Sequence, residues 1–83
     1  MELIPGRLYQ LKDKSHSIIA YKYIMNSHGT WSVLNLNKKL IPIDLVYYMN
    51  KPMLCIAKNS STFGIFLAAQ DTIGLGIQDL VEL

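Results

Sequence analysis

The segment that most constrains the fold runs from Ile18 to Met25 and reads Ile-Ile-Ala-Tyr-Lys-Tyr-Ile-Met. Seven of its eight residues are apolar or aromatic, and most are of the β-branched and aromatic types that strands favour. Turn-forming residues follow at 26–29, and a second segment continues from Thr30 to Leu36. This order predicts a β-hairpin. Because an apolar strand needs cover on both faces, we expect its first arm in the middle of a barrel, a sandwich or an oligomer.

The faces of this hairpin follow from the alternation of side chains along a strand. Lys22 is the single charge in the first arm, so its face is expected to reach water. In the second arm, alternation separates Trp31 from Leu34, so the indole need not face the main core. Gly29 is expected at the turn position that needs a positive φ.

Turn signals divide the rest of the chain into further short segments. We expect strands at about 7–12, 53–58, 62–69 and 72–77, with turns at 59–61 and 70–71. For residues 40–48 we expect an edge strand or a single helical turn, because Pro42 excludes a central strand. For residues 78–83 we expect a strand or a helical turn. The chain therefore predicts one all-β domain over residues 1–83, a small barrel or a strongly bent antiparallel sheet of about five to seven short strands.

Composition indicates a small protein with an excess of apolar surface. The chain has 83 residues, of which 51% are hydrophobic and 17% charged, against about 25% charged in an average domain. A domain of this size hides only about 60–65% of its unfolded surface. We therefore expect a protein partner or a homo-oligomer. Cys55 is the only cysteine, and neither a signal segment nor an apolar membrane span is recognisable, so we expect a cytoplasmic protein without a membrane partner.

The chain has no recognisable catalytic, cofactor or metal motif. His16 and His28 lie in separate expected loops, and Cys55 lies in an apolar run that predicts burial. Gly74-Leu75-Gly76 lacks the further glycines and the following helix of a phosphate-binding loop, so these glycines predict a bulge or a sharp bend. We therefore expect a protein that is not an enzyme and needs no cofactor.

Aromatic residues are the remaining feature that indicates binding. Most are expected in the core, but a tryptophan beside a tight turn and a tyrosine pair near Pro42 predict a partner-binding patch with flanking lysines: Trp31, Tyr47, Tyr48, Lys22, Lys38 and Lys39. Protein binding is the leading hypothesis. The alternative is single-stranded nucleic-acid or nucleotide binding on the same aromatics and lysines. The net charge of +2 is too small to indicate nucleic acid by itself.

The layout of the chain resembles that of SH3-like small β-barrel proteins, in particular short uncharacterised proteins of tailed bacteriophages. The resemblance rests on an opening strand, a long aromatic second strand, a hairpin and the closing segments, at Pro5-Gly6-Arg7-Leu8-Tyr9, Gly29-Thr30-Trp31, Phe66-Leu67, Ile73-Gly74 and Asp79-Leu80-Val81-Glu82-Leu83. Unlike the signalling SH3 domains, the chain has one tryptophan and no acidic run. The resemblance implies an SH3-like barrel and a cytoplasmic accessory protein that binds a host protein and modulates or inhibits it.

Overall fold

The structure, a computed structural model, describes residues 1–12, 20–38, 48–49 and 51–83. These ranges contain strands β1 (Leu8–Leu11), β2 (Tyr21–Met25), β3 (Trp31–Val33), β4 (Met53–Lys58), β5 (Phe63–Ala68), β6 (Asp71–Gly76) and β7 (Leu80–Glu82), with a 3-10 turn η1 (Ile77–Asp79) between the last two. The prediction of an all-β fold with short strands is confirmed.

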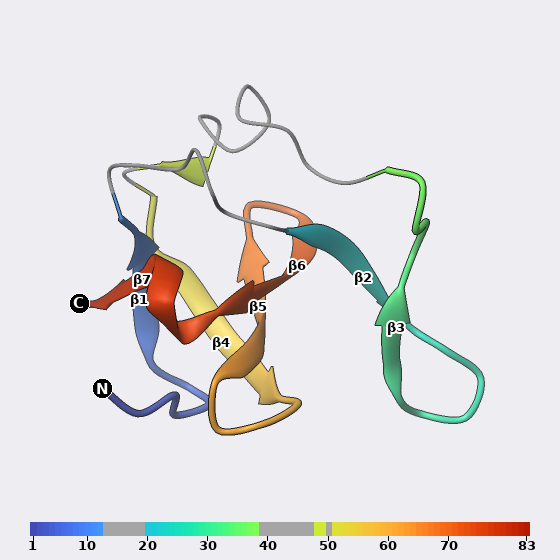
Figure 1. The fold of residues 1–83 in the computed structure, drawn as a ribbon, viewed down its shortest axis with the longest axis horizontal. Helices are drawn as coiled ribbons and strands as arrows, with labels where there is room; N and C mark the ends of the chain where they lie inside the picture. Colours follow the sequence, from blue (N-terminus) through green and yellow to red (C-terminus); the bar gives the residue numbers. More distant parts are fainter. Residues whose placement is uncertain (13–19, 39–47, 50) are drawn as a thin grey trace.

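All seven strands belong to one antiparallel sheet, in the order β3-β2-β6-β5-β4-β1-β7. The end strands β3 and β7 do not pair with each other, so the structure has the open sheet rather than the closed barrel. The β2–β3 hairpin projects from one side of the molecule, and both termini lie on the other side (Figure 1). The hairpin is therefore the part of the sheet farthest from β1 and β7.

One face of the sheet packs the core. Strand register and alternation place there a row of side chains with 0% exposure: Tyr9, Met53, Cys55, Phe66, Ile73 and Leu75. The Tyr9 ring meets the Phe66 ring edge-on, with 5.7 Å between centroids. The Tyr9 hydroxyl accepts a hydrogen bond from the Ile4 N–H (2.8 Å) and donates one to the Glu2 carbonyl (3.0 Å). Burial of this face is the main source of stability, and the one polar tip in it is satisfied.

Several local predictions are confirmed. Strand β4 has the predicted bounds, and the predicted turn at 59–61 follows it. Gly29 has a φ of 80° in the hairpin turn, and its N–H donates to the Asn26 carbonyl at 3.1 Å. The segment 78–83 combines the end of the 3-10 turn with a strand, so it uses both predicted structures. The prediction for residues 40–48 lies outside the described residues except at Tyr48.

The prediction that Ile18 to Met25 forms a strand covered on both faces is wrong for the single chain. Residues 18 and 19 are outside the described ranges, and β2 lies second from the edge of the sheet. Ile24 and Met25, which point to opposite faces, are 48% and 46% exposed. The physical reason is that an apolar run shows that a strand avoids water, but not which molecule covers it.

Of the two alternatives predicted at Gly74 and Gly76, a bulge or a sharp bend, the bulge is wrong. The register between β5 and β6 runs without a break, and the irregularity of the sheet lies in β4 between Cys55 and Ala57. Gly74 is required for a different reason, since a β-carbon there would lie 2.7 Å from the Phe63 ring and closer still to the Tyr23 ring. The glycine leaves room for two aromatic rings to approach the backbone of β6 closely.

Candidate functional site

The structure describes four of the six predicted partner-binding residues. Trp31, Lys22, Lys38 and Tyr48 are in the described ranges, whereas Tyr47 and Lys39 lie outside them. Tyr48 is 3% exposed, and its hydroxyl donates to Asp71 Oδ2 at 2.6 Å. Its ring therefore belongs to the core, and we leave it out of the candidate surface.

Lys22 and Trp31 lie on opposite faces of the hairpin. Lys22 is paired with Ile73, so its side chain lies on the core face. Its Nζ forms an ion pair with Asp71 Oδ1 at 3.6 Å. Trp31 is paired with Met25, which alternation puts on the other face of β2. The structure therefore does not combine the indole and this lysine into one patch. Lys38 is exposed at the base of the hairpin. It ends a turn in which its N–H donates a hydrogen bond to the Asn35 carbonyl at 3.1 Å.

The structure instead places apolar side chains beside Trp31. Tyr23 lies directly across from Val33, and Met25 lies directly across from Trp31, so all four side chains share one face. We call these four residues the hairpin surface. The Tyr23 ring also contacts the Phe63 ring, with 5.9 Å between centroids. The surface therefore continues from the hairpin onto β5.

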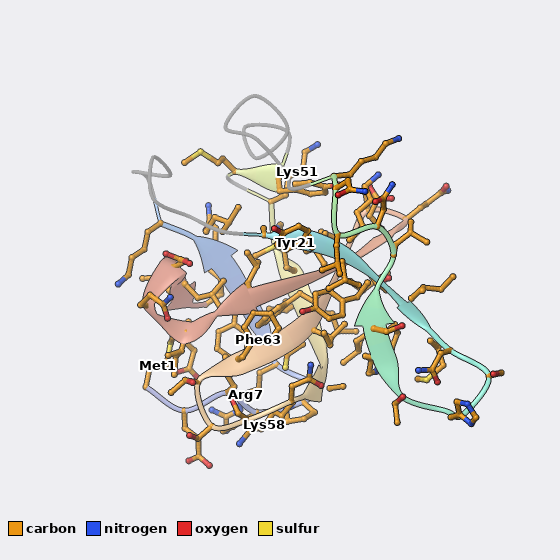
Figure 2. All side chains as sticks on the ribbon, turned by 45° about the vertical axis from the view of Figure 1, so that its right-hand side comes forward. Met1, Arg7, Tyr21, Lys51, Lys58 and Phe63 are labelled. Carbon is orange, nitrogen blue, oxygen red and sulfur yellow. The ribbon has the colours of Figure 1, made fainter. Side chains whose placement is uncertain are left out.

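The hairpin end is held by its own hydrogen bonds rather than by the body of the sheet. Asn26 Oδ1 accepts from the N–H groups of His28 (2.9 Å) and Thr30 (3.1 Å), and Asn26 Nδ2 donates to Thr30 Oγ1 (2.7 Å). Such an Asx-type turn fixes the chain locally. In Figure 2 this turn lies on the opposite side of the molecule from Met1 and Arg7. The hairpin surface therefore lies on a projecting hairpin whose turn has a defined conformation.

The base of the hairpin is fixed to β6. The Thr72 hydroxyl donates to the Tyr23 carbonyl at 2.6 Å, and the Tyr23 ring lies over Gly74. Burial, and to a smaller extent the neighbouring Tyr21, raise the pKa of the Tyr23 phenol above its ordinary value of 10.0. This side chain is therefore neutral at physiological pH and contributes a packed ring rather than a charge.

The whole hairpin is electrically neutral apart from its ends. Residues 23–37, fifteen positions, contain no Asp, Glu, Lys or Arg. The nearest charges are Lys22 and Lys38, one at each end of this stretch. A neutral surface with an exposed methionine and a tryptophan has the composition of a protein interface.

Neither protein-family models nor curated proteins nor solved structures give a match to this chain. In the ranges that the structure describes, His, Cys, Asp and Glu side chains form no group of three that could hold a metal ion. Nor does this part of the chain contain a helix long and apolar enough to cross a membrane.

Cys55 is buried at 0% exposure, as the sequence predicts. Burial raises the pKa of its thiol, against the smaller opposing effects of hydrogen bonding with the Ala57 backbone and of the Lys58 charge. We expect the folded protein to react with a thiol reagent at least about tenfold more slowly than the denatured protein, because access requires local opening. Absorbance after addition of a chromogenic disulfide, with and without guanidinium chloride, measures both rates. Equal rates would show that the thiol is accessible.

Proposed function

We propose that this protein is a non-enzymatic protein-binding module and that the hairpin surface contacts the partner. The observation that carries the proposal is a projecting hairpin with uncovered apolar side chains on both faces. Only Tyr21 and Lys22 of β2 pair with β6, so the rest of β2 pairs with β3 alone. A two-stranded hairpin is marginally stable in water by itself. Cover by a partner stabilises such an element and removes its apolar surface from water.

Burial of the exposed side chains of the hairpin surface is expected to contribute measurably to the free energy of binding. Complete burial of a side chain such as Met25 contributes about 1.5–3 kcal/mol, and Met25 is 46% exposed in the free protein. It can therefore contribute about 1 kcal/mol on binding. A tryptophan at the centre of an interface commonly contributes 2 kcal/mol or more, by the general experience with alanine substitutions.

We further propose that the partner is a protein of a bacterial host, bound and modulated or inhibited in the cytoplasm. This part of the proposal rests on the resemblance of the chain's layout to that of short proteins of tailed bacteriophages. The single cysteine, with its buried thiol, fits a reducing compartment.

Nucleic-acid binding, the alternative from another class, lacks a supporting observation at this surface. Stacked bases would need cations beside the aromatic rings, but residues 23–37 are uncharged, and Lys22 lies near Asp71 on the face away from Trp31. A salt titration separates the two functions. Affinity for an oligonucleotide falls steeply with salt because counterions are released, whereas an apolar protein contact changes little.

Substitution of Trp31 by alanine is expected to lower partner capture by at least about tenfold, because it removes the largest side chain of the hairpin surface. The measurement is quantitative mass spectrometry of bacterial proteins retained by the immobilised chain. Val81→Ala is the matched control, since Val81 is 45% exposed on β7 at the opposite end of the sheet. Circular dichroism should be the same for all three proteins. If no retained protein depends on Trp31 more than on Val81, the proposed surface is wrong.

The single tryptophan provides a second test of the same site. Trp31 is the only tryptophan in the chain, so its fluorescence reports on the hairpin alone. Addition of a purified captured protein should shift its emission to shorter wavelength as the indole leaves water. An unchanged spectrum at saturating partner would place the contact elsewhere.

A further inference from the structure

We propose that the open edge of β3 pairs with β3 of a second copy of the chain, antiparallel and about a two-fold axis at Ser32. The two sheets would join into one continuous sheet. This inference goes beyond the proposed function, because it uses the backbone edge of the hairpin rather than its side-chain surface.

The hydrogen bonds at the two ends of β3 determine which way its backbone groups point. The Asn26 N–H donates to the Thr30 carbonyl at 2.8 Å, and the Leu34 N–H donates to the Lys22 carbonyl at 2.8 Å. In an antiparallel ladder, hydrogen-bonded pairs alternate with pairs that are not hydrogen-bonded to each other. Thr30, Ser32 and Leu34 therefore direct their backbone groups toward β2.

Trp31 and Val33 consequently direct their N–H and C=O groups away from β2, to the open edge. Within the described part of the chain, β3 has β2 as its only neighbouring strand. Two donors and two acceptors thus lie along an edge of three residues. Such groups pair readily with a further strand.

A two-fold axis at Ser32 satisfies all of these groups at once. Trp31 then faces Val33 of the second copy, and Val33 faces Trp31 of the second copy. Each of these two pairs exchanges two hydrogen bonds, so no outward group of β3 is left unpaired. The same register puts an aromatic residue opposite a β-branched one, a favourable cross-strand combination, and places the small Ser32 at the axis.

The absence of charge along the open edge of β3 favours pairing with β3 of a second copy of the chain. Edge strands are usually protected by charge or proline, and residues 23–37 contain neither, so two copies meet without repulsion between like charges. The opposite edge of the sheet, at β7, carries charge, because Glu82 lies on this strand and forms an ion pair with Arg7 at 3.0 Å. Pairing of β3 with β7 of the next copy would also be head-to-tail and would continue into a filament unless it formed a ring, whereas the two-fold pairing closes as a dimer.

The first test is a cross-link at the axis. Two Ser32 residues would form a pair without mutual hydrogen bonds, with Cα atoms about 4.5 Å apart, which lies within the range that a disulfide spans. The native Cys55 is buried, so Ser32→Cys adds the accessible thiol. We expect this full-length variant to form a disulfide dimer on mild oxidation at least about tenfold faster than Ser27→Cys, an exposed turn position. Equal rates on non-reducing gels would overturn the inference.

The second test blocks the edge. Val33→Pro removes an outward N–H but no hydrogen bond to β2, because proline is tolerated where its missing N–H faces an open edge. By light scattering we expect the wild type to have twice the 9.4 kDa of one chain and Val33→Pro to have the mass of one chain. A monomeric wild type at about millimolar concentration, or a dimeric Val33→Pro, would overturn the inference. If Val33→Pro fails to fold, the cross-link decides.

Glu82→Pro is the matched control for this substitution. The Leu83 N–H donates to the Leu8 carbonyl (3.2 Å) and the Lys12 N–H donates to the Asp79 carbonyl (3.0 Å). By the same alternation, the N–H of Glu82 points to the open edge of β7. This variant should remain a dimer, and a monomeric Glu82→Pro beside a dimeric Val33→Pro would assign the contact to β7. A monomeric wild type that still captures a partner through Trp31 would contradict the dimer and leave the proposed function standing.

Discussion

Replacement of Phe66 by alanine is expected to lower the free energy of unfolding by about 3–5 kcal/mol. Phe66 has 0% exposure, lies in the central part of the sheet and meets the Tyr9 ring edge-on. A domain of this size has a total stability of only about 4–12 kcal/mol. The variant should therefore unfold at much lower urea concentration, and a fraction should be unfolded in buffer. Urea denaturation followed by circular dichroism measures the loss.

Phe63→Ala is the control for this prediction. Phe63 is on the same strand but on the opposite face and is only half-buried, so its loss should cost clearly less than that of Phe66. Equal or reversed losses would contradict the assignment of Phe66 to the buried core and of Phe63 to a half-buried position.

Replacement of Gly74 by alanine is expected to cost about 1–3 kcal/mol, as for other substitutions that overfill a packed site. The added β-carbon would overlap the Tyr23 and Phe63 rings that lie over this glycine. One or both rings must move away, and the base of the hairpin is then less firmly held. Urea denaturation gives the cost, and the ring shifts of Tyr23 in a proton NMR spectrum show the displacement.

Gly76→Ala is a close control because it lies two residues later on the same face of β6. The three atoms nearest to its β-carbon would all belong to the side-chain amide of Gln78, the closest at 2.6 Å, and that exposed side chain can rotate away. We expect a stability within about 0.5 kcal/mol of the wild type. In the Gly74→Ala background, Tyr23→Ala should cost less than it does in the wild type, because the obstructed ring is gone. Additive losses at the two sites would mean that the rings do not press on Gly74.

Much of the local structure could be predicted because it depends on short stretches of chain. Met53 to Lys58 forms a strand between turn-forming residues, and Gly29 adopts the positive φ that the hairpin turn needs. Tyr9 and Leu11 share the buried face, as alternation along a strand requires. The overall all-β architecture followed from the same signals repeated along the chain.

The candidate site was predicted less completely, because it depends on contacts between distant residues. The position of Tyr48 near Pro42 indicated an exposed edge, yet its hydroxyl donates a hydrogen bond to Asp71 on β6, a later strand. Met25 and Val33 carry no binding signal in the sequence. Only the register of the hairpin puts them beside Trp31.

By itself, the sequence determined that a hairpin forms around the turn at 26–29 and that this hairpin is apolar and nearly free of charge. The tertiary structure decided that this hairpin stands at the end of the sheet and is left uncovered there. Its position depends on the pairing of Tyr21 with Gly74, which are far apart in the chain. Because the hydrophobic effect has no direction, an apolar strand requires cover without specifying whether the same chain or another molecule provides it.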